Sequence, residues 1–182
     1  EKLRISGKIR SFGVSNETPW GVMRYLSLSE KKGFERIISI QNPYNLLNRT
    51  FEQGLAEISF QESIGLLAYS PLAFGLLTGK YFRDLQPARA RLTLFSRFKR
   101  YQTKNAMKAT GEYLRLANEH SLDPTQMALA YVRTRPFVSS VLLGATSIKQ
   151  LEANLESLEI VLPEEILEGI ERIHNRFPNP CT

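Results

Sequence analysis

The chain has 182 residues, with 42% hydrophobic and 23% charged side chains, which suffices for one domain with a buried core and is typical of a globular protein. Its apolar runs are far shorter than the roughly 20 residues that cross a bilayer, and its single cysteine, Cys181, excludes an internal disulfide and favours a reducing, cytoplasmic setting. The net charge of +6 favours anionic partners, and much of the excess lies between residues 89 and 104.

The first predicted strand covers residues 8–14, where polar and apolar residues alternate before a turn. A helix is predicted next, because Thr18 suits the N-cap, Pro19 suits the first helical position and Gly33 suits a left-handed C-cap. Its apolar face is expected to consist of Trp20, Met23 and Leu26. This segment therefore predicts one strand followed by one helix.

Two more strands are predicted at residues 37–41 and 66–70, where β-branched and other apolar residues are concentrated. The helix between them is expected to carry Phe51, Leu55 and Ile58 on one face. The ends of the three predicted strands recur at a nearly constant interval with a helix in each gap. This rhythm is typical of successive right-handed βα units in a parallel sheet.

The rhythm is interrupted by residues 71–104, a long basic segment that contains glycine. A connection of this length is rarely idle in a compact domain, so it is the best loop candidate for a functional role. Two helices are predicted after it, at residues 106–120 and 124–135, with Asp123 as the N-cap of the second. Residues 139–143 predict a fourth strand.

Two further helices are predicted near the C-terminus. The apolar stripe of the first consists of Ile148, Leu151, Leu155 and Leu158. The second begins at Pro163, and its inward face is expected to consist of Ile166, Leu167, Ile170 and Ile173.

These elements indicate an α/β protein, and two architectures fit four parallel strands with helices on one side. One is part of a closed (β/α)8 TIM barrel, and the other is a small doubly wound open sheet. No predicted strand is followed by a glycine-rich dinucleotide fingerprint, since Gly75 and Gly79 lie inside the long segment. The barrel fragment is therefore favoured.

Polar residues follow each predicted strand, at the edge where barrels of this kind place their active sites. They are Ser15, Asn16, Gln41, Asn42, Tyr69, Ser70, Gly144, Thr146 and Ser147. Amides, hydroxyls and one aromatic ring suit a flat, amide-bearing ring that needs hydrogen bonds at its edge and stacking on its face. The same residue types also favour turns and helix caps, which is the alternative interpretation of each of them.

Four motifs in order resemble the C-terminal half of an aldo-keto reductase. They are GKIRSFGVSN at residues 7–16, IQNPYNLLNR at 40–49, AYSPLAFGLLTGKY at 68–81 and LLGATSIKQLEAN at 142–154. With TLFSRFKRY at residues 93–101, the chain is most similar to the bacterial Tas-like branch of that family.

The resemblance implies that residues 1–182 form the C-terminal half of a single barrel domain, with roughly the last four βα units and a C-terminal helix. It implies an NADPH-dependent oxidoreductase (NADP as the oxidised cofactor) that reduces aldehydes and ketones. The catalytic residues of the family come from the N-terminal half, so no catalytic residue is expected here and the isolated chain is expected to be inactive.

The resemblance also implies three groups of cofactor-binding residues. Those at the nicotinamide carboxamide and ring are Ser15, Asn16, Gln41 and Tyr69. Those at the pyrophosphate are Ser70, Leu72, Gly75, Lys80 and Arg91. Those at the adenosine and its 2′-phosphate are Gly144, Thr146, Gln150 and Asn154. Gln150 and Ala153 replace an arginine and an acid found in several relatives, which leaves the choice between NADPH and NADH open.

Other functions remain as alternatives. One is a non-catalytic, NADPH-sensing module related to the potassium-channel β subunits, and a weaker one is a nucleic-acid-binding domain based on the basic residues 89–104. We expect a small-molecule carbonyl partner, no nucleic acid and no membrane. We also expect no metal, because no cluster of Cys, His, Asp and Glu has ligand spacing. His120 and His174 are expected to have surface or helix-dipole roles.

Overall fold

The computed structural model describes residues 1–82, 90–95 and 99–181. Within these residues, one parallel sheet has four strands in the order β1-β2-β3-β4. The strands are β1 (Val14–Ser15), β2 (Ser39–Pro43), β3 (Gly65–Tyr69) and β4 (Val138–Val141). Ser15 pairs with Gln41, Gln41 pairs with Leu67, and a register shift between Leu66 and Leu67 adjusts β3 to β4. The predicted α/β class is therefore confirmed.

The described part of the chain also contains α-helices and short 3-10 helices. The α-helices are α1 (Lys2–Ile5), α2 (Pro19–Lys32), α3 (Leu55–Glu62), α4 (Arg91–Leu94), α5 (Lys104–Glu119), α6 (Pro124–Arg133), α7 (Ile148–Glu156) and α8 (Glu164–Arg176). The 3-10 helices are η1 (Thr50–Glu52), η2 (Ala73–Thr78), η3 (Lys99–Tyr101) and η4 (Ser157–Glu159).

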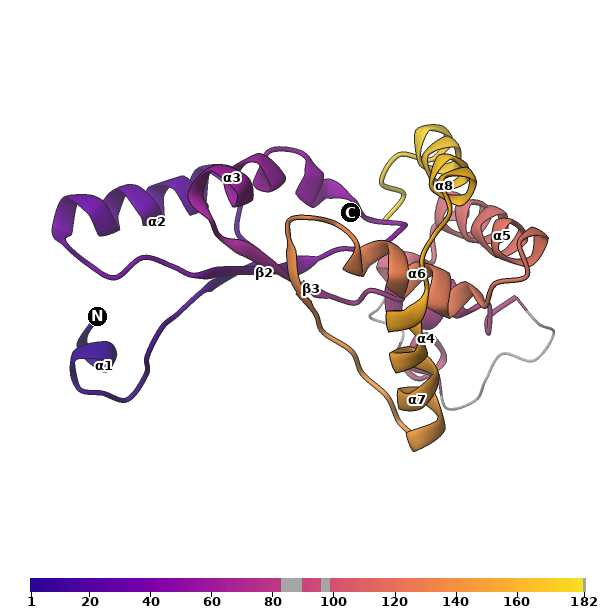
Figure 1. Ribbon diagram of the computed structural model, residues 1–182, viewed down its shortest axis with the longest axis horizontal. Helices are drawn as coiled ribbons and strands as arrows, with labels where there is room; N and C mark the ends of the chain where they lie inside the picture. Colours follow the sequence, from indigo (N-terminus) through magenta and orange to yellow (C-terminus); the bar gives the residue numbers. More distant parts are fainter. Residues whose placement is uncertain (83–89, 96–98, 182) are drawn as a thin grey trace.

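The helices form two groups along the sheet (Figure 1). Helices α2 and α3 lie side by side and contact each other, whereas α5 packs against both α6 and α8. The short helix α1 buries no residue and lies away from the others. No helix among the described residues is both long and apolar enough to cross a membrane.

The two faces of the sheet differ in burial. The face toward the helices carries Ile40, Leu66 and Ala68, which are fully buried in the hydrophobic core. The opposite face carries Gln41, Leu67 and Tyr69, which are only half-buried. This alternation follows from the two-residue period of a strand, and it leaves the second face of the sheet open.

Small residues occupy the open face near the start of the strands. They are Gly13, Ser39, Gly65 and Ser139. A Cβ on Gly65 would lie only 1.6 Å from Ser139 Oγ, and a Cβ on Gly13 would lie 2.3 Å from Ser39 Oγ. The strands are therefore too close there for a larger side chain at either glycine.

Helix α2 begins and ends where the sequence predicts. The Thr18 hydroxyl accepts a hydrogen bond from the Gly21 amide at 3.1 Å, and Gly33 takes a left-handed φ of 63° at the C-cap. The predicted apolar face is only partly right, because Trp20 is 75% exposed and Met23 is exposed as well. The buried face instead carries Val22 and Leu26.

The strand predicted at residues 8–14 is wrong except at its end, because β1 covers only Val14–Ser15. Among the described residues β1 has one neighbour, β2, and the pairing extends back only to the Phe12 carbonyl, which accepts from the Ile38 amide at 3.0 Å. Alternation alone therefore does not hold residues 8–11 in a strand. The second strand also begins two residues later than predicted, at Ser39.

The helix predicted around Phe51 is divided in two. Phe51 is buried in η1, whereas Leu55 begins α3 after Gly54, whose φ of 94° separates the two elements. The third strand, β3, matches its prediction to within one residue.

The predicted apolar stripes of the last two helices differ in burial. In α8, Ile166, Ile170 and Ile173 are buried as expected, and Leu167 is half-buried. In α7 and η4 the whole stripe is exposed, with Ile148 at 76%. A hydrophobic stripe predicts the helix correctly in both cases, but only α8 has a partner for it among the described residues.

Candidate cofactor-binding site

Three predicted residues meet at the carboxyl ends of β1 and β2. The Ser15 hydroxyl donates to the Gln41 carbonyl at 3.0 Å, and the Asn16 amide N–H donates to the same carbonyl at 3.0 Å. The Asn16 side-chain amide donates to Ser15 Oγ at 3.2 Å. Because Gln41 lies directly opposite Ser15 in the sheet, the three side chains share one edge.

Tyr69 joins this group from the end of β3. Its hydroxyl donates to Asn16 Oδ1 at 2.7 Å, across 53 positions of the sequence. Asn16 takes a φ of 55°, a left-handed conformation that Asn tolerates better than most side chains. The Asn16 amide thereby links Tyr69 to Ser15, so an aromatic ring, a hydroxyl and a side-chain amide lie together.

Asn42, the residue after Gln41, is held beneath this edge. Its side-chain amide donates to the Glu17 carbonyl at 3.2 Å, and its Oδ1 is buried without a hydrogen-bond partner among the described residues. Asn42 therefore braces the turn that carries Asn16.

The chain after β3 forms a turn with unusual backbone angles. Ser70, Ala73, Phe74 and Gly75 have φ values of 54°, 49°, 57° and 88°. Only the last is a glycine, so the turn stores strain of about 1–3 kcal/mol at each of the other positions. Such a turn persists only where its surroundings hold it, and we call residues 70–75 the Ser70–Gly75 turn.

Two cations lie at this turn. A Cβ on Gly75 would lie 2.6 Å from Lys80 Nζ, so the lysine folds directly over the glycine. The Arg91 guanidinium lies 5.3 Å from the centre of the Phe74 ring. Burial and, to a smaller extent, the charge of Arg91 lower the pKa of Lys80 below its usual value. An anionic ligand beside the turn would offset both effects.

The third predicted group follows β4 and forms a local cluster. The Thr146 amide N–H and hydroxyl both donate to Gln150 Oε1 at 3.0 Å, and Ser147 caps α7. Gly144 is exposed and Asn154 is buried on α7. Among the described residues, no hydrogen bond joins this cluster to the groups at β1–β3. The basic residues Arg89 and Arg97 lie outside the described residues.

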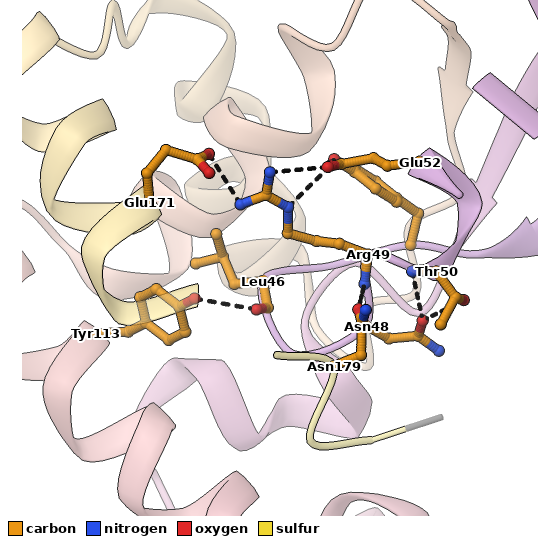
Figure 2. Close-up of polar contacts among 9 residues, drawn as sticks. Leu46, Asn48, Arg49, Thr50, Glu52, Tyr113, Glu171 and Asn179 are labelled. Atoms are coloured by element: carbon orange, nitrogen blue, oxygen red, sulfur yellow. Dashed lines mark hydrogen bonds and ion pairs between the residues drawn. The ribbon is translucent and has the colours of Figure 1, made fainter. Parts of the chain in front are cut away.

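Sequence reasoning missed a buried ionic cluster centred on Arg49 (Figure 2). Arg49 is 7% exposed; its guanidinium donates to both carboxylate oxygens of Glu52 at 2.8 Å and to Glu171 of α8 at 2.8 Å. Its backbone N–H donates to Asn179 Oδ1 at 2.6 Å. The cluster therefore ties the segment after β2 to α8 and the C-terminal tail. Arg49 lies in the IQNPYNLLNR motif and Glu52 follows three residues later, but Glu171 and Asn179 are 122 and 130 positions away.

The titratable groups of the cluster are strongly coupled. Burial raises the pKa of Glu52, but hydrogen bonds from Arg49 and Tyr44 outweigh it and leave the pKa below its usual value. Burial, reinforced by Glu52, raises the pKa of Tyr44 far above its usual value. Burial and the charge of Arg49 lower the pKa of His174. At neutral pH the cluster therefore holds Arg49 charged, Glu52 charged and Tyr44 protonated.

No group of three or more side chains suited to a metal ion occurs in residues 1–82, 90–95 and 99–181. The described site residues instead offer hydroxyls, amides, an aromatic ring and two cations. These groups are suited to an organic ligand that carries an amide and negatively charged phosphates.

The sequence pattern of the Aldo/keto reductase family matches residues 1–175. The chain therefore belongs to the aldo/keto reductase family, and its parallel βα units with polar strand ends agree with that assignment.

Individual relatives support the same family. The chain is 57% identical to the protein named Tas of Escherichia coli K12 over 176 residues. This matched segment is 97% of this chain and 51% of Tas. It is 37% identical to an aldo-keto reductase of Babesia bovis, over 99% of this chain and 66% of the relative. A putative voltage-gated potassium channel subunit beta of Schizosaccharomyces pombe is 29% identical, over 97% of this chain and 54% of that protein. The chain thus spans about half the length of Tas.

Proposed function

We propose that the protein carrying this chain is an NADPH-dependent aldehyde and ketone reductase. The observation that carries the proposal is the meeting of Ser15, Asn16, Gln41 and Tyr69 at one edge of the sheet. Membership of the aldo/keto reductase family supports it independently.

The residues at the strand ends fit a nicotinamide group. Ser15 and Asn16 are exposed and Gln41 is half-buried, so a ligand at the strand ends can reach all three. Their hydroxyl and amides both donate and accept hydrogen bonds, as a carboxamide requires. The ring of Tyr69 supplies an aromatic surface, and its bond to Asn16 fixes the hydroxyl end of that ring.

The Ser70–Gly75 turn fits the phosphates of the same cofactor. Because Gly75 has no Cβ, the Lys80 side chain can fold directly over it, and Arg91 lies beside the neighbouring Phe74 ring, so two positive charges lie at the turn. Charge-assisted hydrogen bonds to phosphate are among the strongest that side chains make. We propose that Leu72 lines this part of the site and that Gly144, Thr146, Gln150 and Asn154 contact the adenosine and its 2′-phosphate.

When bound, the cofactor supplies a hydride for the carbonyl carbon of the substrate. The residues of this chain would orient the nicotinamide and hold its phosphates. The carbonyl oxygen takes a proton, and we propose that the acid that donates this proton belongs to the part of the protein outside this chain. The products are then an alcohol and the oxidised cofactor.

We further propose that this chain is the C-terminal half of one (β/α)8 barrel domain, with its last four βα units. In the described residues β1 and β4 each pair on one side only. One face of the sheet is open, and α2 and α7 expose apolar side chains that include Trp20 and Ile148. The length of Tas, about twice the matched segment, supports the same proposal.

The test compares two preparations, the 182-residue chain and the intact protein at the length at which its source makes it. NADPH and NADH are titrated into each, and oxidation of NADPH is followed with a panel of aldehydes and ketones. We expect the intact protein to bind NADPH and to reduce a carbonyl compound, and the isolated chain to give no turnover. An intact protein that binds neither cofactor would overturn the proposal, and robust turnover by the isolated chain would overturn its half-barrel part.

A second candidate is a cofactor-binding module without catalysis. The observation that favours it is the similarity to the protein named as a potassium channel subunit beta. It predicts that the intact protein binds NADPH yet oxidises it with none of the carbonyl compounds. The same titration and assay therefore separate the two candidates.

A further inference from the structure

We propose that Asn45 is a positioning residue that holds the Ser70–Gly75 turn in its cofactor-binding shape by joining the two ends of the long segment between β3 and α5. The inference rests on the proposed function, because that function gives the turn its ligand. It assigns a role to a side chain that does not itself touch the ligand.

Asn45 is fully buried, and every polar atom of its side chain has a partner. Its Nδ2 donates to the Ser70 carbonyl at 3.0 Å and to the Tyr101 hydroxyl at 3.1 Å. Its Oδ1 accepts from the Leu47 amide at 2.9 Å. A buried amide that uses both donor hydrogens on two distant segments is costly to replace, because each lost partner leaves an unpaired polar group.

The two acceptors are the beginning and the end of the long segment. Ser70 directly follows β3, and Tyr101 lies three residues before α5. Asn45 is separated from them by 25 and 56 positions in sequence. One side chain therefore fixes how the segment leaves the sheet and how it returns.

Both contacts act on the strained turn. The Ser70 carbonyl also accepts from the Ala73 amide at 2.9 Å, which closes the turn. The Tyr101 ring packs edge-on against Phe74, with ring centres 5.0 Å apart. Ser70 and Phe74 are two of the non-glycine residues in left-handed conformation, so Asn45 supports the turn at both ends.

The backbone around Asn45 is itself held by hydrogen bonds. Asn45 and Asn48 exchange two backbone hydrogen bonds at 3.0 Å, and the Tyr44 amide donates to the Tyr69 carbonyl. The Arg49 cluster then fixes the end of the same segment to α8 (Figure 2). The site residues at β2 and β3 are thereby linked through one short segment, residues 44–49.

The test uses three variants of the intact protein. Asn45→Asp keeps the shape and the acceptor for Leu47 but removes the amide donor. Tyr101→Phe removes only the hydroxyl that Asn45 contacts. The matched control is Tyr113→Phe, which removes another buried tyrosine hydroxyl, one that donates to the Leu46 carbonyl in the same segment.

The first measurement is amide hydrogen exchange at Ala73 and Gly75 without ligand, and the second is the dissociation constant for NADPH. For Asn45→Asp we expect faster exchange at both amides and weaker binding of NADPH, with a dissociation constant about ten times larger than that of the wild type. Tyr101→Phe should also speed exchange at the two amides and raise the dissociation constant for NADPH, but by less than Asn45→Asp. Tyr113→Phe should lower the unfolding temperature and leave both quantities at their wild-type values.

Unchanged exchange at Ala73 and Gly75 in both Asn45→Asp and Tyr101→Phe would overturn the inference, as would equal changes in Tyr113→Phe. If Asn45→Asp does not fold, Tyr101→Phe decides alone. A wild-type protein that does not bind NADPH would overturn the proposed function, whereas the exchange data would still decide whether Asn45 holds the turn.

Discussion

Arg49 is a buried cation that depends on its ion-pair partners to remain stable in the fold. Its guanidinium is almost fully buried, and the surrounding oxygens of Glu52 and Glu171 compensate its loss of water. The ring of Tyr131 lies 5.5 Å away and adds a cation–π contact. A buried pair of this kind contributes little compared with a well-packed apolar pair, but losing one partner is strongly destabilising.

Replacing Arg49 with Met should therefore lower the free energy of unfolding by about 3 kcal/mol, because Glu52 keeps its charge without its main partner. The measurement is chemical denaturation of the intact protein. The control is Arg172→Met on α8, where the arginine is exposed and its ion pair with Glu168 spans 3.5 Å. The control should change the free energy by less than about 0.5 kcal/mol, and equal losses in both variants would contradict the role of Arg49.

The same cluster predicts an acid-side loss of stability. The pKa of Glu52 is lower in the folded protein than its usual value of 4.5, so its charge stabilises the fold above that pH. The contribution should disappear as the pH falls through the lower, folded pKa. Denaturation curves measured across this pH range should show that the difference in free energy of unfolding between the wild type and Glu52→Gln shrinks as the pH falls. An advantage that stays constant down to acid pH would contradict the coupling.

Residue types after predicted strands selected Ser15, Asn16, Gln41 and Tyr69, and the structure brings them together, whereas a ligand shared by them stays a prediction. Each lies at a strand end, and parallel strands bring such ends together. Asn45 and Arg49 could not be selected in this way, because Ser70, Tyr101 and Glu171 lie in segments whose approach depends on tertiary packing. A polar residue within the apolar run from Tyr44 to Leu47 was the only local signal for Asn45.

At the scale of elements, the capping residues predicted the ends of helices more reliably than the hydrophobic stripes predicted their buried faces. Thr18, Gly33 and Asp123 mark helix ends correctly because caps depend on local hydrogen bonds. The faces of α2 and α7 could not be predicted from the pattern alone, because a hydrophobic stripe does not say which element will cover it. The edge strand β1 was overextended for a related reason, since alternation does not supply a hydrogen-bonding neighbour.

Helix α6 gives the clearest test of a cap. Asp123 Oδ1 accepts from the Thr125 and Gln126 amides, and most residues of the helix are buried. Asp123→Ala should lower the free energy of unfolding by about 1 kcal/mol, because two amides lose their acceptor. Thermal or chemical denaturation measures the change. Asp123→Ser, which can still accept, should retain most of the stability, and a loss as large as that of Asp123→Ala would contradict the capping role.

At the scale of the whole molecule, the sheet has an open face and two edges among the described residues. Unpaired edges and exposed apolar helix faces are features that proteins normally cover. The open face carries only small residues near the start of the strands, at Gly13, Ser39, Gly65 and Ser139. These features agree with the proposal that the chain is one half of a barrel whose strand ends share a single cofactor.

The most direct test of that proposal is a crystal structure of the intact protein with NADPH. It should show the carboxamide in hydrogen bonds with Ser15, Asn16 and Gln41, the nicotinamide ring on Tyr69, and the phosphates beside Lys80. It should also show new strands paired to the outer edges of β1 and β4. A cofactor bound away from these strand ends would contradict the account, as would edges left unpaired in the intact protein.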